Sequence, residues 1–164
     1  MFKVYVIPVL EFGCPIFNPY YGKDIECIEK VQRDFTRVVY KRSPLYRLNS
    51  ETCPSYTERL TIFKLETLES RRLKICLNLF HQYLHGLVPL STNSFQISSS
   101  RTRGDSHKIT PQFASKDVRF NSFFIRYARI YSQLPSAVRN SSPISFPTLL
   151  EHTVLTPYLS KTEG

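Results

Sequence analysis

A chain of 164 residues, 41% of them hydrophobic, is long enough to bury one globular core, and its 12 Phe and 10 Tyr supply bulky side chains for it. The 22 Lys and Arg exceed the 13 Asp and Glu and give a net charge of +9, which favours a polyanionic partner, either nucleic acid or an anionic membrane surface. Judged from charge alone, the alternative is a protein that is basic but has no polyanionic partner. No apolar run approaches the roughly 20 residues of a membrane span, so we expect no membrane insertion.

The cysteines and the N-terminal segment indicate the cellular compartment. The 4 cysteines stand too far apart for a CxxC clamp, and no His lies at zinc-finger spacing from them. We therefore expect reduced, mostly buried thiols and no bound metal or cofactor. The run VYVIPVL is short, contains Pro8 and lacks a small-residue cleavage site, which argues against a signal peptide. We expect a nuclear or cytoplasmic protein that is not secreted.

The first third of the chain contains one strong helical pattern. Residues 2–12 fit either a short helix or a buried strand, and FGCPIFNPYYG, residues 12–22, predicts a loop because it is rich in turn formers. A helix is predicted over residues 23–42, with acidic residues in its first turn and basic residues in its last. Its predicted inward stripe is Ile28, Val31, Phe35 and Val38. A basic stripe lies on another face: Lys30, Arg33, Arg37 and Lys41.

The middle of the chain predicts a short helix over residues 55–63 and a long one over residues 66–85. The predicted inward residues of the long helix are Leu73, Leu77, Phe80 and Leu84. The predicted outward residues are Arg71, Lys74, Asn78, His81 and His85. Gly86 and Pro89 end the helix. The spacing of His81 and His85 can hold zinc, but no third ligand is evident, so we interpret them as surface histidines.

The last part of the chain begins with a basic loop and then returns to helical periodicity. The segment SSSRTRGDSHKIT predicts a loop that short extended segments can flank. The segment RFNSFFIRYARIYSQLP, residues 119–135, predicts a helix that ends at Pro135. Its inward stripe is Phe120, Phe123, Phe124, Tyr127, Tyr131 and Leu134, with Arg119, Arg126 and Arg129 opposite. A last short helix before Pro157 would begin with a capping box of Thr148 and Glu151.

These elements predict a mainly α protein, a small helical bundle with a basic loop and short extended segments as an option at its flanks. We expect helical regions over residues 1–90 and 117–160, joined by the loop over residues 91–116. No GxSxG elbow, GxGxxG or P-loop occurs, so no active site is complete. What recurs is a basic stripe on an amphipathic helix. For one helix, solubilising charge is the simpler explanation.

Several basic segments in one chain favour a phosphate-binding surface over solubilising charge. Lys and Arg bind phosphates by releasing counterions, without reading the base sequence. The candidate nucleic-acid-binding residues are Lys30, Arg33, Arg37, Arg71, Arg72, Lys74, Arg101, Arg103, Lys108, Arg126 and Arg129.

Five motifs occur in one order: VIPVLEFGCPIFNPY, DIECIEKVQRDFTRVVYK, RRLKICLNLFHQYLHGLVPL, SRTRGDSHKI and NSFFIRYARIYSQLP. This series closely resembles the C-terminal part of the reverse transcriptase polyprotein of non-LTR (LINE-type, jockey-like) retrotransposons, over about residues 4–150. The chain departs from the family pattern at Ile7, usually Arg, at Phe17, usually Trp, and at Tyr131-Ser132, usually Trp-Asn. These departures suggest a diverged or decaying copy.

The resemblance implies that this region follows the palm, as the thumb and post-thumb segment that grips the template–primer duplex. The implied partners are an RNA–DNA hybrid or duplex nucleic acid and the missing palm and fingers of the parent polyprotein. The resemblance also implies backbone contacts from Arg71, Arg72, Lys74 and His85. The paired aspartates that hold the catalytic metals are absent, so we expect no enzyme activity from this chain alone.

Two alternatives belong to other classes. The chain could be a non-catalytic protein–protein interaction module, or a non-functional pseudogene fragment. Large exposed apolar patches near Tyr5, Phe12 or Phe17 would favour a missing partner domain. A continuous basic groove would favour nucleic acid.

Overall fold

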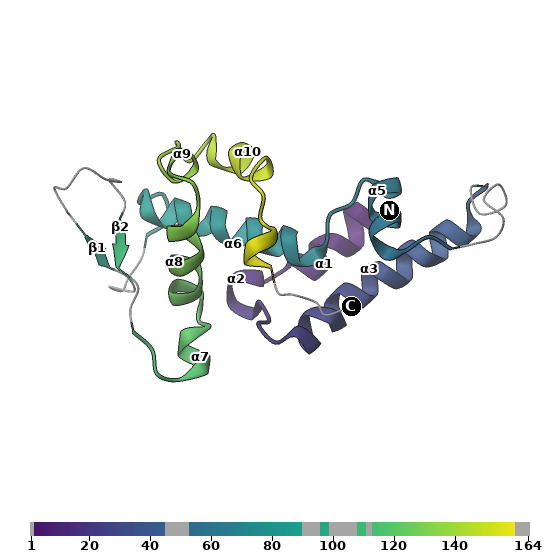
Figure 1. Ribbon diagram of the computed structural model, residues 1–164, viewed down its shortest axis with the longest axis horizontal. Helices are drawn as coiled ribbons and strands as arrows, with labels where there is room; N and C mark the ends of the chain where they lie inside the picture. Colours follow the sequence, from purple (N-terminus) through teal and green to yellow (C-terminus); the bar gives the residue numbers. More distant parts are fainter. Residues whose placement is uncertain (1, 45–52, 90–95, 99–107, 111–112, 160–164) are drawn as a thin grey trace. The chain divides into compact units, whose positions relative to one another are not determined.

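The computed structural model describes residues 2–44, 53–89, 96–98, 108–110 and 113–159 of the chain, and these are mainly helical (Figure 1). The predicted mainly α fold is therefore confirmed. None of the described helices is both long enough and apolar enough to span a membrane.

The chain divides into two compact units. Unit 1 comprises residues 1–12, 19–72 and 159–164, and unit 2 comprises residues 13–18 and 73–158. The division falls inside the long helix, between Arg72 and Leu73, and not at the predicted loop. The physical reason is packing, because Phe80 of that helix lies 6.3 Å from Phe123 and 5.4 Å from Tyr131 between ring centroids. The part of the long helix that follows Arg72 thus belongs with the C-terminal helices.

Unit 1 begins with a helical segment, which settles the alternative between helix and strand at residues 2–12. A π-helical turn, η1 (Phe2–Val6), runs into α1 (Ile7–Glu11). Phe2 and Ile7 are buried, and the Phe2 ring stacks on Phe35 with centroids 3.9 Å apart. The two side chains fix the N-terminal segment in unit 1 through apolar contacts.

The helix α3 (Gly22–Arg42) agrees with the prediction to within one residue, but it buries a different face. The buried residues are Ile25, Glu29, Gln32, Thr36 and Tyr40. From the predicted inward stripe, Val31 and Val38 are 43% and 46% exposed, so this prediction was wrong. A polar face can be buried only where its groups find hydrogen-bond partners. On α3 those partners come from two other segments of unit 1.

One of these segments is α5 (Tyr56–Phe63), which lies beside α3 (Figure 1). Its start is a complete capping box, in which Ser55 and Glu58 bond each other's backbone N–H. It ends at Lys64 in the left-handed conformation, with φ 50°. The other segment is the first turn of α6 (Leu68–Leu84), the predicted long helix.

In unit 2, the predicted inward residues of α6 are confirmed, because Leu73, Leu77, Phe80 and Leu84 are all buried. The predicted end is also confirmed. Gly86 has φ +68°, which suits a residue without Cβ, and the Leu87 N–H donates to the Gln82 carbonyl at 3.1 Å.

The segment predicted as a loop over residues 12–22 contains a short helix, α2 (Cys14–Phe17), so this part of the prediction was wrong. Gly13, with φ 66°, turns the chain, and Pro15 in the first turn sacrifices no helical hydrogen bond. The Cys14 and Cys76 sulfurs are both buried and lie 3.8 Å apart. All four thiols are free, but Cys27 and Cys53 are exposed, so only half of them are buried as expected.

Two short strands, β1 (Gln96–Ser98) and β2 (Lys108–Thr110), pair antiparallel with Ile97 opposite Ile109. Short extended segments were an option at the flanks of the basic loop, and β2 forms from the last three residues of the segment predicted as loop. Arg101, Arg103 and His107 lie outside the described residues.

The predicted helix over residues 119–135 is broken in two, α7 (Asp117–Phe120) and α8 (Phe123–Gln133). The break follows from local hydrogen bonds, because the Asn121 amide donates to the Asp117 carbonyl and the Ser122 hydroxyl to the Arg119 carbonyl. Phe120 is therefore exposed and does not face inward as predicted. Tyr127, Tyr131 and Leu134 are buried, as predicted.

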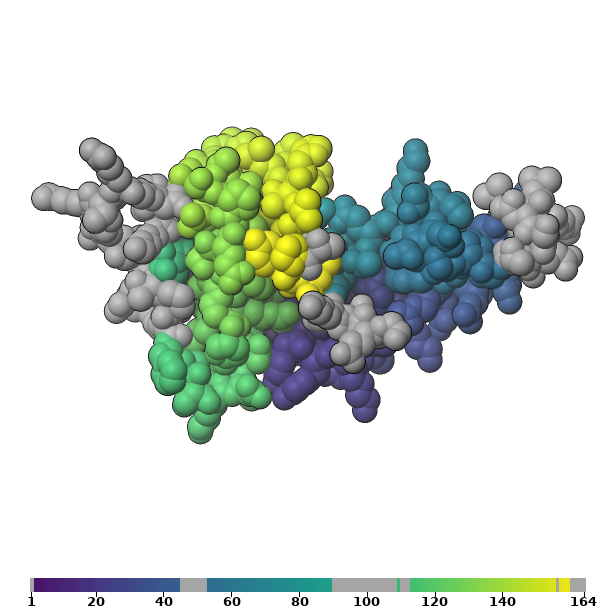
Figure 2. All heavy atoms as spheres, viewed as in Figure 1, coloured from purple at the N-terminus to yellow at the C-terminus, as the bar shows by residue number. Residues whose placement is uncertain are grey.

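Unit 2 continues with α9 (Ser136–Arg139), α10 (Phe146–Glu151) and the 3-10 turn η2 (Thr156–Tyr158). α8 crosses α6 (Figure 1), and the atoms of α8, α9 and α10 form one continuous block, green to yellow in Figure 2. The predicted capping box of Thr148 and Glu151 was wrong, because α10 begins at Phe146 and contains both residues.

Candidate nucleic-acid interface

Among the described residues, the basic stripe of α3 is the most exposed of the candidate surfaces. Lys30, Arg37 and Lys41 are exposed, and none of them makes an ion pair or side-chain hydrogen bond in the described part of the chain. Their spacing places them about a third of a turn away from the buried polar face. These three cations, which we call the α3 basic row, are therefore available to a ligand.

Arg33, a fourth residue of the predicted stripe, is used within the protein. Its guanidinium holds the Glu26 carboxylate at both oxygens, with Nη2 3.0 Å from Oε2, and lies 5.2 Å from the centroid of the Tyr56 ring. The hydrogen bond to Glu26 raises the pKa of Arg33. We therefore do not count Arg33 among the available cations.

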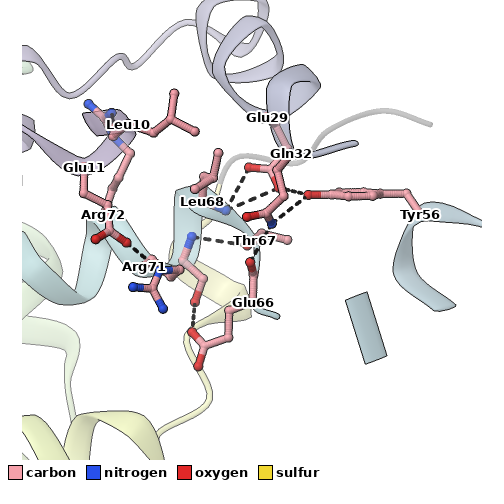
Figure 3. Close-up of polar contacts among 11 residues, drawn as sticks. Leu10, Glu11, Glu29, Gln32, Tyr56, Glu66, Thr67, Leu68, Arg71 and Arg72 are labelled. Carbon is pink, nitrogen blue, oxygen red and sulfur yellow. Dashed lines mark hydrogen bonds and ion pairs between the residues drawn. The ribbon is translucent and has the colours of Figure 1, made fainter. Parts of the chain in front are cut away.

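The buried face of α3 is held by a network that we call the polar hub: Glu29, Gln32 and Tyr56, with the backbone of Glu66 and Leu68 (Figure 3). The Tyr56 hydroxyl and the Leu68 N–H, at 2.9 Å, both donate to the Glu29 carboxylate. The Gln32 amide donates to the Glu66 carbonyl at 2.8 Å and to the Tyr56 oxygen at 3.0 Å. Glu29 thereby accepts from the first turn of α6, which satisfies a backbone donor that the helix itself leaves open.

Burial sets the electrostatics of the hub. It raises the pKa of the Glu29 carboxyl, although the hydrogen bonds from Tyr56 and the backbone act in the opposite direction. Burial and the bond to Glu29 also raise the pKa of the Tyr56 phenol. The buried Arg59 completes this region by donating to the Thr36 hydroxyl at 3.4 Å and to the Pro54 carbonyl. The hub is a structural network, which the sequence patterns did not reveal.

The arginine pair at the start of α6 also faces the protein (Figure 3). Arg71 forms an ion pair with Glu11, and the buried Arg72 donates to the Leu10 carbonyl. Both arginines therefore attach the first turns of α6 to α1, and the burial of Arg72 leaves it little access to a nucleic-acid backbone. Lys74, a predicted outward residue, is half-buried in unit 2.

In unit 2, two of the predicted arginines lie together on α8. Arg126 is half-buried and donates to the Asn18 carbonyl at 3.2 Å. Arg129 lies over the ring of Phe120, with its guanidinium carbon 3.6 Å from the ring centroid. Of Lys108 only the backbone is described, and the rest of the basic loop lies outside the described residues. The structure thus gathers candidate residues into one group on α3 and another on α8.

The histidine at position 81 is not a surface residue, in contrast to the prediction. It is fully buried, with its ring stacked on Phe146 at 3.9 Å. The Tyr131 hydroxyl donates its proton to the Arg139 carbonyl at 3.0 Å. The His81 Nδ1 lies 2.8 Å from the Tyr131 oxygen and must therefore be the donor in that hydrogen bond. The described residues contain no group of three or more side chains arranged to hold a metal. His81 therefore links α6 to α8 and α10 as part of the core.

Large apolar side chains are exposed at the three positions where exposure would favour a missing partner domain. Tyr5, Phe12 and Phe17 are 69%, 86% and 75% exposed. In unit 1, Tyr5, Val9 and Phe12 are all exposed and follow a four-then-three spacing, which places them on one helical face that we call the N-terminal apolar face. Several large exposed side chains on one face are typical of a surface that another protein segment covers.

Comparison with known proteins finds a match over part of the chain. The chain is 30% identical over 86 residues to a protein of Caenorhabditis elegans that is described as uncharacterised. The match covers 52% of this chain and 40% of the relative, so the chain spans well under half of that protein's length. No family model and no solved structure matches the chain. The resemblance to a retrotransposon reverse transcriptase therefore stays a prediction.

Proposed function

We propose that the chain is a non-catalytic part of a non-LTR retrotransposon reverse transcriptase, which binds the template–primer duplex through its phosphate backbone. The observation that supports this best is the α3 basic row, whose three cations are exposed and engaged with no other described residue. Unpaired surface cations in a chain of net charge +9 favour a polyanionic ligand.

The geometry of the row suits a nucleic-acid backbone. At about 1.5 Å of rise per residue, the row from Lys30 to Lys41 is about 16 Å long. A strand of duplex presents a phosphate about every 3.4 Å along its axis, so the row reaches several phosphates of one strand. Such contacts recognise the shape of an RNA–DNA hybrid and not its sequence. The chain would act in the nucleus or cytoplasm, together with the palm and fingers of its parent polyprotein.

A second candidate, a protein–protein interaction module, is favoured by the exposed Tyr5, Phe12 and Phe17. The two candidates are compatible in one molecule. The apolar and basic residues of α3 lie on separate faces, so a partner protein can cover the first while nucleic acid binds the second. What distinguishes the candidates is whether the chain binds nucleic acid at all.

Fluorescence anisotropy with a labelled RNA–DNA hybrid tests the proposal between about 50 and 200 mM salt. If about four to six phosphates are neutralised, the log–log plot of affinity against salt should have a slope of about −4 to −5. Replacing Lys30, Arg37 and Lys41 together by Ala should make that slope less steep by about two to three units.

The matched control keeps all three charges and exchanges their types, with K30R, R37K and K41R. It should retain the slope, because backbone contacts depend mainly on charge. If the wild-type titration is flat, the nucleic-acid proposal fails and the interaction module becomes the leading reading. If the alanine variant keeps the full slope, the α3 basic row is not the binding surface.

A further inference from the structure

The break between α7 and α8 creates a contact that a continuous helix would not allow. It turns Phe120 back over α8, where the Arg129 guanidinium carbon lies 3.6 Å from the ring centroid. At this distance the guanidinium is in van der Waals contact with the ring, as in a cation–π pair. We call Phe120 and Arg129 the stacked pair. Both residues belong to unit 2.

The charge of Arg129 is poorly compensated where it lies. Its Nε is buried and has no hydrogen-bond partner, and Arg129 makes no ion pair in the described part of the chain. Burial and the nearby positive charge of Arg126 lower the pKa of Arg129. An anion bound beside the two guanidinium groups would offset the repulsion between them.

Within the stacked pair, Phe120 is accessible and Arg129 is half-buried. Phe120 is 38% exposed, and Figure 1 shows α7 at the N-terminal end of α8, away from α9 and α10. Arg126 stands one turn before Arg129 on the same face of α8. An exposed aromatic ring and two neighbouring arginines provide both a stacking surface and phosphate ligands.

We propose that the stacked pair, with Arg126 beside it, binds one unpaired nucleotide of a single strand. The base stacks on the pair, and the adjoining phosphate accepts hydrogen bonds from Arg126 and Arg129. This inference rests on the proposed nucleic-acid function and adds a second kind of ligand to it. The α3 basic row contacts a duplex backbone, and the stacked pair holds an unpaired base.

The competing role of the stacked pair is structural, because the same contact could serve only to attach α7 to α8. The two roles differ in whether the bases of the ligand matter. We therefore compare a short single-stranded DNA with a strand of the same length whose residues are abasic, so that the phosphates are equal. Binding to both strands is measured by competition against a labelled strand, and a 2-aminopurine in the first strand reports stacking by its fluorescence.

The wild-type chain should bind the base-bearing strand at least about 5-fold more tightly than the abasic strand, as expected for one base stacked on an aromatic platform. Phe120→Leu keeps an apolar contact for α7 but removes the ring, and Arg129→Lys keeps the charge but removes the planar group. Both variants should lose most of this preference and the fluorescence change. Their affinity for the abasic strand should stay within about twofold of the wild type, because the charges are retained.

Two matched controls should keep the preference. Arg119→Gln removes an exposed charge from α7, and Phe113→Leu removes an exposed ring outside the stacked pair. Thermal unfolding followed by circular dichroism shows which variants are folded. If only one of Phe120→Leu and Arg129→Lys folds, that variant alone is sufficient to compare the base preference with that of the wild type. The inference is overturned if the wild-type chain does not prefer the base-bearing strand, or if a folded variant of the stacked pair keeps the preference.

These results separate the inference from the proposed function. Binding to a duplex with the expected salt slope, but without a preference for bases in the single strand, leaves the function standing and removes the inference. If the wild-type chain does not bind duplex but still prefers the base-bearing single strand, the proposed function fails and the stacked pair stands as a binding site for single strands.

Discussion

Replacing Glu29 by Ala removes the acceptor at the centre of the polar hub. Two donors, the half-buried Tyr56 hydroxyl and the buried Leu68 N–H, then lose their partner. Each such loss costs about 1–3 kcal/mol of stability. Removing the buried carboxyl also removes the cost of its own desolvation, which offsets part of this loss. We therefore expect unit 1 to lose about 2–4 kcal/mol of stability at neutral pH.

Glu29→Gln separates the charge from the hydrogen bond. Its carbonyl can still accept from one donor, so the loss at neutral pH should be about 1 kcal/mol. The raised pKa of Glu29 means that the folded chain holds this proton more tightly than the unfolded chain. The pH-dependent part of the contribution of Glu29 is therefore fully present below its ordinary pKa of 4.5 and is lost as the pH rises through the folded pKa. Glu29→Gln should remove this dependence.

Urea unfolding followed by circular dichroism measures the three chains at pH 4.5 and at neutral pH, and hydrogen exchange of the Leu68 amide reports on the hub directly. The matched control is Glu26→Ala on the same helix, which breaks a partly exposed ion pair to Arg33 and should cost at most about 1 kcal/mol. The reasoning is refuted if Glu29→Ala is no more destabilising than Glu26→Ala, or if Glu29→Gln keeps the pH dependence of the wild type.

Three further predictions concern the core, the basic loop and catalysis. Leu77→Ala or Phe80→Ala should destabilise unit 2 by about 2–5 kcal/mol in urea unfolding. The control Ile75→Ala, at a partly exposed position, should cost clearly less, and an equal loss of stability would contradict the packing of α6. Replacing Arg101 and Arg103 together by Ala should flatten the salt slope by up to about two units with unchanged circular dichroism, and an unchanged slope would exclude the loop from binding. With Mg²⁺, primer, template and nucleotides, the purified chain should extend nothing, and genuine extension would disprove the absence of a polymerase site.

The positions of the long helices could be predicted because their signals are local. Periodicity, charged ends and a terminal glycine located α3 and α6 to within two residues. The inward set of α6 was also correct, since apolar residues form a single stripe there. The break at Asn121-Ser122 carried a local signal as well, because both residue types compete with a helix for backbone hydrogen bonds.

The buried face of α3 and the burial of His81 could not be predicted in this way. Gln32 is buried because Tyr56 and the Glu66 carbonyl, from other segments, accept its amide hydrogens. His81 is buried because Phe146 and Tyr131 enclose it from α10 and α8. A pattern along one helix records how polar its residues are, but it does not record which partners the fold brings to them. The same limit explains why Arg71 and Arg72 were assigned to a nucleic-acid backbone and not to their partners Glu11 and Leu10 on α1.

The choice of buried face on α3 bears directly on what the chain does. Had the helix buried Val31, Phe35 and Val38, its only unusual surface would be the basic row. Because the polar hub occupies the interior of unit 1, part of the apolar stripe is left exposed, in addition to the N-terminal apolar face. Exposed apolar area on this scale is unfavourable in water and is relieved when another protein segment covers it. A chain that binds nucleic acid through the α3 basic row should therefore do so as part of a larger assembly, with its apolar faces turned toward a protein and its cations toward the phosphates.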